Sequence, residues 1–180
     1  MIRDARPAEM GEVGDIRIAA YRAGGFISED SGYAPTLRGL GADGSGHVLV
    51  ALDGADRGPG RGEAVVGTVM LQLWPLTGQV VTGPHEAEIR ALAVRPHAQG
   101  RGIGRELLYR VMERAAELGI PQLVLCTEPE MRSAHHLYEQ AGFARLPGRD
   151  WSPAPGVSLI VYGRPTGPAP DPGRQPVPGR

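Results

Sequence analysis

The chain has 180 residues, of which 41% are hydrophobic, and its formal net charge is −1 at pH 7. This length allows one domain with a sizeable core. The balanced charge gives no electrostatic reason to expect nucleic acid or an anionic membrane as a partner, and no stretch approaches the ~20 apolar residues of a membrane span. The first twenty residues show no targeting signal, so the cytoplasm is the expected location.

The N-terminal half is predicted to contain three strands and two helical segments. In chain order these are a strand at 2–5, a helix at about 8–22, a short helix or loop at 31–40, and strands at 47–52 and 64–74. The region 53–62 is rich in glycine and is expected to form an extended hairpin loop. A second loop, 75–85, leads into the next strand.

The middle of the chain predicts a buried strand followed by a helix. Residues 88–94 are apolar enough for a mostly buried strand, and Pro96 ends it because proline has no N–H for the ladder. Apolar side chains then recur at helical spacing, namely Ile103, Leu107, Val111, Ala115 and Leu118. Gly119 is a stop signal for this helix. The segment 99–104, Gln-Gly-Arg-Gly-Ile-Gly, therefore lies at the helix N-terminus.

Such a segment is suited to bind a phosphate. Unpaired N–H groups and the positive end of the helix dipole face outward, and the missing Cβ atoms of Gly100, Gly102 and Gly104 let an anion approach the main chain. Arg101 and Arg105 add charge-assisted bonds. A tight turn with two solvated arginines is the alternative. The dinucleotide fingerprint requires glycine at position 105, and the Walker A loop requires a lysine, which the chain lacks, so both motifs are excluded.

The C-terminal part predicts further strands, a helix and a tail. The expected elements are a strand at 122–127, a helix at about 131–141, and strands at 143–146 and 157–162. The strand, helix and strand from 88 to 127 form a parallel crossover, whereas the other neighbours are hairpin-like, so a mixed sheet is expected. Residues 165–180 alternate proline and glycine and are expected to be disordered, which leaves one domain at 1–164.

One cysteine, Cys126, is present, which excludes an intrachain disulfide and a thiolate metal cluster. It lies in the predicted strand 122–127, so a buried structural thiol is the favoured interpretation. A nucleophilic cysteine would need an exposed position and a nearby base. No metal site is expected.

Several segments together resemble the GCN5-related N-acetyltransferase (GNAT) family. Gln99-x-x-Gly102-x-Gly104 resembles its acyl-CoA pyrophosphate loop, 88–94 resembles its central strand, and 137–143, Leu-Tyr-Glu-Gln-Ala-Gly-Phe, resembles its later helix-to-strand signature. Residues 2–9 resemble a common opening of the family. The resemblance implies an α/β (α+β) fold with a mixed, mostly antiparallel sheet of six to seven strands, a central parallel crossover and about four flanking helices. It also implies that the central strand splays from the Cys126 strand and leaves a slot for the pantetheine arm.

The resemblance further implies acetyl-CoA or another acyl-CoA as cofactor. The implied contacts are Leu92, Ala93, Val94, Gln99, Gly100, Arg101, Gly102, Ile103, Gly104 and Arg105. The main chain of Leu92 and Val94 would pair with pantetheine like an added strand, and an N–H there would polarise the thioester carbonyl. Many family members dimerise, so a homodimer is compatible with the resemblance.

Two side chains are candidates for acid–base chemistry. Glu88 stands six positions before Val94, as a glutamate does in the histone-acetyltransferase branch of the family, and a partly enclosed carboxylate there would take a proton from an amine. An exposed Glu88, with Glu86 or water as the base, is the alternative. Tyr138 lies on the inward stripe of helix 131–141 and is the candidate acid for the departing sulfur, with plain core packing as the alternative. The family often has a cofactor-binding asparagine where this chain has Met131.

The expected reaction moves an acetyl group directly, in a ternary complex, to a primary amine of a small molecule or peptide. The acceptor is expected to contact the region 21–40 and two later loops. Candidate contacts are Glu29, Tyr33, Trp74 and Trp151, with solvation or ordinary packing as the alternative for each. A non-catalytic acyl-CoA-binding or regulatory module is the competing function, and a longer-acyl or O-acyl transferase also stays open.

Overall fold

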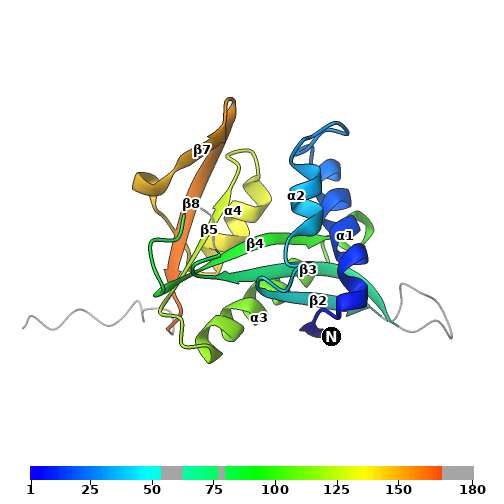
Figure 1. Ribbon diagram of the computed structural model, residues 1–180, viewed down its shortest axis with the longest axis horizontal. Coiled ribbons are helices and arrows are strands. Elements are labelled where there is room, and N and C mark those ends of the chain that lie inside the picture. The colour runs from blue at the N-terminus through cyan, green and yellow to red at the C-terminus, as the bar shows by residue number, and fades with distance from the viewer. Residues whose placement is uncertain (54–62, 77–79, 168–180) are drawn as a thin grey trace, which may run out of the picture.

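The computed structural model describes residues 1–53, 63–76 and 80–167, and its centre is one mixed β-sheet (Figure 1). The strands are β1 (Ile2–Asp4), β2 (His47–Asp53), β3 (Ala64–Leu73), β4 (Glu86–Val94), β5 (Gln122–Thr127), β6 (Ala144–Arg145), β7 (Trp151–Ala154) and β8 (Val157–Pro165). They are arranged in the order β1-β2-β3-β4-β5-β8-β6, and β7 pairs with β8. Only the pairing of β4 with β5 is parallel among the described strands.

The described part of the chain contains four α-helices, which are α1 (Met10–Ala23), α2 (Ala34–Gly39), α3 (Ile103–Glu117) and α4 (Arg132–Gln140). Short 3₁₀ turns lie at Pro7–Glu9, Pro96–Ala98 and Pro147–Arg149. None of these helices is long and apolar enough to cross a membrane. The predicted mixed sheet and the parallel β4-α3-β5 crossover are confirmed.

The two faces of the sheet carry different helices. Adjacent residues of a strand point to opposite faces, and accordingly Leu49 packs in a core cluster with side chains of α3 and α4, whereas Val50 packs in a second cluster with Val13 and Ile16 of α1. Figure 1 shows α1 and α2 on one side of the sheet and α3 on the other. A ligand that passes between two strands can therefore contact α4 on one face and α1 on the other.

The sheet contains one strand more than the predicted six to seven. The additional strand, β7, has four residues and includes Pro153, so its sequence lacks the apolar alternation of a strand. β8 also extends beyond the predicted range 157–162, because Gly163, Arg164 and Pro165 pair with β5. Thr166 donates its main-chain N–H to the Pro121 carbonyl at 3.0 Å. The rest of the predicted tail, 168–180, lies outside the described residues, as do 54–62 and 77–79 of the two predicted loops.

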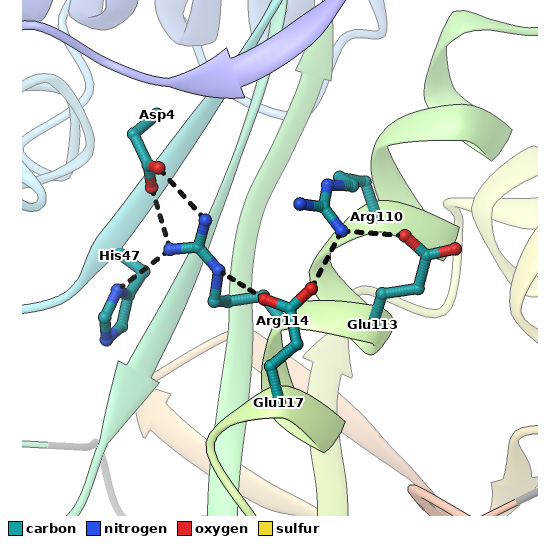
Figure 2. Close-up of polar contacts among 6 residues, drawn as sticks. All are labelled: Asp4, His47, Arg110, Glu113, Arg114 and Glu117. Atoms are coloured by element: carbon teal, nitrogen blue, oxygen red, sulfur yellow. Dashed lines mark hydrogen bonds and ion pairs between the residues drawn. The ribbon is translucent and has the colours of Figure 1, made fainter.

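Helix α3 is fixed to the sheet at both ends. A Cβ at Gly67 of β3 would lie 2.9 Å from Leu107 Cδ1, so glycine at this position allows α3 to approach closely. Figure 2 shows the far end, where Arg114 donates to both carboxylate oxygens of Asp4 at 2.9 and 3.0 Å and also contacts His47 and Glu117. These contacts join the C-terminal half of α3 to β1 and β2, and so help to fix the direction of its N-terminus.

The strands β4 and β5 pair over only part of their length. Their hydrogen-bonded register begins at Glu86 with Gln122 and ends at Ile89 with Leu125. β4 continues to Val94 and β5 to Thr127, so the second half of β4 has no pairing on its β5 side. The predicted separation of these two strands is thus confirmed, and main-chain groups of β4 remain available to a ligand.

Candidate active site

A cavity of about 570 Å³ extends from the segment before α3, along β4, to the end of α1. The end of β5 and the first turns of α4 complete its wall. Most of the predicted cofactor residues line it, namely Leu92, Ala93, Val94, Gln99, Gly100, Gly102, Ile103 and Gly104. Tyr138 lines it as well. The fold therefore brings the glycine segment, the unpaired edge of β4 and the candidate acid into one cavity.

The glycine segment has the backbone of an anion site. Gly102 is the N-cap of α3 with φ +81°, and Gly100 has φ +74°, conformations that residues with a Cβ rarely adopt. No side chain caps this helix end, so its first N–H groups face the cavity without an intrahelical acceptor. Gly104 differs, because a Cβ there would make an ordinary contact of 3.7 Å with Val94.

Three polar residues of the segment have partners within the protein. Arg101 forms an ion pair with Asp53 at the end of β2, and the Arg105 guanidinium lies over the Tyr109 ring, 5.5 Å from its centroid. Gln99 donates its amide to the Val94 carbonyl at 3.1 Å, which closes the turn between β4 and the segment. Arg101 and Arg105 do not line the cavity. Contact of either arginine with phosphate stays a prediction.

A β-bulge interrupts β4 beside the cavity. Met70 pairs with Arg90 and Thr68 pairs with Ala93, so two residues of β4, Ala91 and Leu92, stand opposite one residue of β3. Ala91 has φ +50°, the only positive φ of a non-glycine residue in the described chain. Such a conformation costs roughly 1–2 kcal/mol and is retained mainly where the fold requires it, often at functional sites. The bulge leaves Ala91 and Leu92 outside the β3–β4 pairing, next to the main-chain positions predicted to polarise the thioester.

Glu88 is buried in β4, which rules out its alternative interpretation as an exposed strand end. Its side chain is 3% exposed, and it forms an ion pair with Arg90, whose Nε lies 3.6 Å from Glu88 Oε1. Arg90 in turn donates to the Gln72 amide oxygen at 2.7 Å. The Cys126 thiol donates to the same Glu88 oxygen across 3.8 Å. Glu88 does not itself line the cavity, but it contacts Cys126, which does, so its carboxylate lies one side chain away from the cavity.

Cys126 is only partly buried, because it lines the cavity. Burial and the negative charge of Glu88 raise the pKa of the Cys126 thiol to about 12. Cys126 therefore remains protonated at neutral pH. Because only a thiolate is a competent nucleophile, the structure favours transfer that does not pass through this cysteine.

Glu86, the alternative base, is occupied by an ion pair. Arg149 donates to both of its oxygens at 2.8 and 2.7 Å, and Thr82 donates its main-chain N–H at 2.9 Å and its hydroxyl at 3.1 Å. The Arg149 hydrogen bonds, with those of Thr82, lower the pKa of Glu86 to about 2. A carboxylate with such a low pKa is a poor proton acceptor, so the geometry favours Glu88.

The Glu86 ion pair predicts a specific pH dependence of stability. Because its native pKa of about 2 lies below the ordinary 4.5, the charged carboxylate stabilises the fold above pH 4.5 and loses this contribution as the pH falls towards 2. Glu86→Gln is expected to cost about 2 kcal/mol at pH 7 and to lower the unfolding temperature by several degrees. Thermal unfolding followed by circular dichroism should show the difference from wild type shrinking between pH 5 and pH 2. Glu113→Gln, which removes an exposed ion pair, is the control. A difference in unfolding temperature between wild type and Glu86→Gln that stays constant with pH would contradict the stabilising role of the charged Glu86.

Tyr138 has the inward orientation that its helical stripe predicts. It is 7% exposed, and its ring packs 6.1 Å from Phe143 and 6.2 Å from Tyr162, measured between centroids. Burial raises the pKa of Tyr138 above its ordinary value, so the phenol stays protonated. The hydrogen bonds within the described residues include none from its hydroxyl. A protonated phenol in the cavity is suited to donate a proton, as the candidate acid must.

The predicted acceptor residues come from several separate segments of the chain. Glu29 is exposed in the loop after α1, and Trp74 after β3 is 47% exposed. Tyr33 lies near Arg90. Burial raises the pKa of Tyr33, and the positive charge of Arg90 partly opposes this rise. Trp151, at the start of β7, packs against the same cluster of buried valines as Cys126. None of the four lines the cavity, and their contact with an acceptor stays a prediction.

One wall of the cavity overlaps the start of the predicted acceptor region 21–40, but none of its side chains was predicted from the sequence. It is formed by the end of α1 and the following turn, and its residues are Ala20, Tyr21, Ala23, Gly24 and Phe26. Their place over β4 follows from how α1 packs on the sheet, which the spacing of apolar residues does not specify. The sequence signal for this wall is weak, because it consists of one polar aromatic residue, Tyr21, near the end of a helix.

Comparison with known proteins places this site in a family. The model of the acetyltransferase (GNAT) family matches residues 15–143. Mycothiol acetyltransferase from Beutenbergia cavernae is 36% identical over 77 residues, 43% of this chain and 25% of that protein. Mycothiol acetyltransferase from Cellulomonas flavigena is 31% identical over 127 residues, 66% of this chain and 34% of that protein. The matched part of the chain thus spans a quarter to a third of the length of these relatives.

Solved structures share the fold at low sequence identity. A GNAT-family acetyltransferase from Staphylococcus aureus Mu50 has a TM-score of 0.68 and 18% identity, with 93% of this chain and 99% of that chain covered. The structure of yncA from Salmonella typhimurium, solved with its cofactor acetyl-CoA, has a TM-score of 0.62 and 20% identity, with 95% and 97% covered. The family model extends over more than half of the sequence, and the chain belongs to the acetyltransferase (GNAT) family.

Proposed function

We propose that this domain transfers an acetyl group from acetyl-CoA to a primary amine. The observation that carries the proposal is the single cavity that joins the uncapped N-terminus of α3, the unpaired edge of β4 and the Tyr138 side chain. The chain's place in the GNAT family and the acetyl-CoA bound to a structural neighbour support it. We assign this activity to the domain predicted at 1–164, extended by Pro165, which pairs with Gln122 of β5.

The cavity fits the parts of acetyl-CoA in order. The first N–H groups of α3, with glycines at positions 100 and 102, suit the pyrophosphate. Beyond Ile89, main-chain N–H and C=O groups of β4 can pair with the pantetheine amides as a neighbouring strand would. The thioester would then lie near the bulge at Ala91 and Leu92, where Cys126 and Tyr138 also line the wall.

The residues around the thioester end supply the three functions that acyl transfer to nitrogen requires. Glu88 takes a proton from the incoming amine, so that the nitrogen lone pair can form the N–C bond. A main-chain N–H at the bulge donates to the carbonyl oxygen as negative charge develops there. Tyr138 donates a proton to the sulfur as the C–S bond breaks, and CoA leaves as a thiol. Direct attack by the amine agrees with the protonated state of Cys126.

We further propose that the acceptor is a small-molecule or peptide amine that enters from the α1 face of the sheet. Glu88 supports this direction, because it shares one face of β4 with Arg90, and Arg90 lies near Tyr33 of the segment between α1 and α2. Curated relatives are named mycothiol acetyltransferases, which is compatible with a small amine. Glu29, Trp74 and Trp151 remain candidate contacts, and a homodimer is compatible with the proposal.

Two measurements on the whole chain test the function. Isothermal titration with acetyl-CoA measures binding, and a panel of amines, from simple alkylamines to amino acids and short peptides, is then screened for release of free thiol from acetyl-CoA. Binding together with turnover of at least one amine is the expected result. Binding without turnover of any amine would favour a non-catalytic acyl-CoA module, and absence of binding would contradict the proposal altogether.

A further inference from the structure

A second tyrosine lies at the thioester end of the cavity. Tyr21 comes from the last turns of α1 and lines the same cavity as Tyr138 and Cys126. The charges of Tyr33, Tyr138, Cys126 and Arg17 influence the pKa of Tyr21, so these groups lie in its surroundings. Because Cys126 contacts the candidate base Glu88, Tyr21 lies among the groups proposed to act on the reacting atoms rather than at the pyrophosphate end.

The Tyr21 ring is held in place and its hydroxyl is available. The ring meets Phe26 edge to face, with 6.3 Å between centroids and an interplanar angle of 81°. The Phe26 N–H donates to the Tyr21 carbonyl at 2.9 Å, which fixes the turn that ends α1. No hydrogen bond within the described ranges uses the Tyr21 hydroxyl. Burial raises the pKa of Tyr21 above its ordinary value, so this hydroxyl stays protonated and can donate.

A buried positive charge lies next to Tyr21. Arg17 precedes it by four residues and so shares its face of α1. Arg17 is 0% exposed, and its Nη1 donates to the Leu40 carbonyl at 2.6 Å. Among the described residues it has no acidic partner, and its Nε and Nη2 have no acceptor. Burial lowers the pKa of Arg17 to about 10, which still leaves it charged at neutral pH. The α1 side of the site thus carries a positive potential that favours nearby negative charge.

The two tyrosines approach the slot from different faces of the sheet. Tyr138 of α4 packs in the core cluster beneath one face, whereas α1 packs on the opposite face. A pantetheine arm that arrived from the glycine segment and α4 would present its sulfur to Tyr138. Its acyl group would then continue towards α1, on the side of the cavity that Tyr21 lines.

We infer that Tyr21 is a catalytic residue that donates a hydrogen bond to the thioester carbonyl oxygen. Together with the main-chain N–H at the β4 bulge, Tyr21 forms an oxyanion site with two donors. The positive charge of Arg17, next to Tyr21, favours negative charge on the carbonyl oxygen. This inference rests on the proposed acetyl transfer, and it gives Tyr21, at the start of the predicted acceptor region 21–40, a role towards the thioester.

The test uses acetyl-CoA labelled with ¹³C at the carbonyl, whose resonance moves downfield when hydrogen bonds polarise the bond. The full-length wild type is expected to shift this resonance on binding, and Tyr21→Phe to reduce the shift while acetyl-CoA affinity changes less than about threefold. With an amine found in the panel, kcat should fall roughly 100-fold, in line with the loss of one oxyanion donor, while KM for acetyl-CoA stays similar. Tyr109→Phe, at an exposed position of α3 outside the cavity, is the matched control.

The outcomes separate this inference from the function on which it rests. Failure of the wild type to bind acetyl-CoA would contradict the proposed function. A wild-type shift that persists unchanged in a folded Tyr21→Phe would overturn the role of Tyr21. Tyr138→Phe should slow turnover but keep the shift of the carbonyl resonance, because the Tyr138 hydroxyl is proposed to donate a proton to the sulfur and not to the carbonyl oxygen. If the shift were lost in Tyr138→Phe and kept in Tyr21→Phe, the assignment of the two phenols would be wrong.

Discussion

Replacing Gly102 with glutamate is expected to weaken acetyl-CoA binding by roughly 100-fold, or about 2.7 kcal/mol. The loss of affinity comes from the new carboxylate, which would lie at the uncapped end of α3, where it would compete for the free N–H groups and repel the pyrophosphate. A second effect acts on stability. Position 102 has φ +81°, a conformation that costs a residue with a Cβ roughly 1–2 kcal/mol in the free and the bound protein alike.

A matched glycine separates the two effects. Gly119 also has a positive φ, +70°, and a Cβ there would have no neighbour within 4 Å, but it follows the other end of α3. Gly119→Glu should therefore lower the unfolding temperature and leave acetyl-CoA affinity unchanged. Isothermal titration and thermal unfolding of both variants make the comparison. Equal losses of affinity in the two variants, or normal binding by Gly102→Glu, would contradict the pyrophosphate site.

Local patterns in the sequence predict the elements that position this site. The structure begins α3 at Ile103, within the segment 99–104, and gives β5 its predicted range. Both have strong local signals, which are apolar periodicity in the helix and a β-branched and apolar run in the strand. β7 had no such signal because proline interrupts its four residues. The end of β8 was missed because Gly163, Arg164 and Pro165 resemble turn residues until their partner in β5 is known.

The residues of the candidate site also fall into those that local sequence patterns predict and those that depend on distant contacts. The glycine segment and Tyr138 belong to contiguous motifs, so their positions were predictable. The sequence left Glu86 and Glu88 open, because they lie two residues apart on one face of the same strand. Arg149, 63 residues away, decides between them by holding Glu86 in an ion pair. The bulge at Ala91 and the place of Tyr21 depend in the same way on packing between distant segments, which composition and spacing do not encode.

Replacing Glu88 with glutamine is expected to lower kcat/KM by a factor of about 100 to 1,000 at neutral pH, the range typical of a lost general base. Glutamine keeps the size of the side chain and fills the buried position, but it cannot accept a proton from the amine. Glu88 is not part of the cavity lining, so acetyl-CoA affinity should change little. A large fall in kcat/KM with intact binding would place the defect in the chemical step.

The pH profile of the variant distinguishes a lost base from a distorted site. Without Glu88, only acceptor molecules that have already lost a proton in solution can react. Their fraction rises tenfold per pH unit below the pKa of the amine, so the activity of Glu88→Gln should rise steeply with pH and approach that of the wild type in alkaline solution. A site damaged by the loss of the contact between Glu88 and Arg90 would show no such recovery.

Glu86→Gln is the control that tests the choice between the two carboxylates. Its ion pair with Arg149 gives Glu86 a structural role, so this variant should lose thermal stability and keep kcat/KM within about threefold of wild type when assayed well below its unfolding temperature. If Glu86→Gln instead lost activity with alkaline recovery and Glu88→Gln did not, the base would be Glu86, and the Arg149 ion pair would have to open during turnover. The structure argues against that, because Arg149 and Thr82 together occupy both Glu86 oxygens.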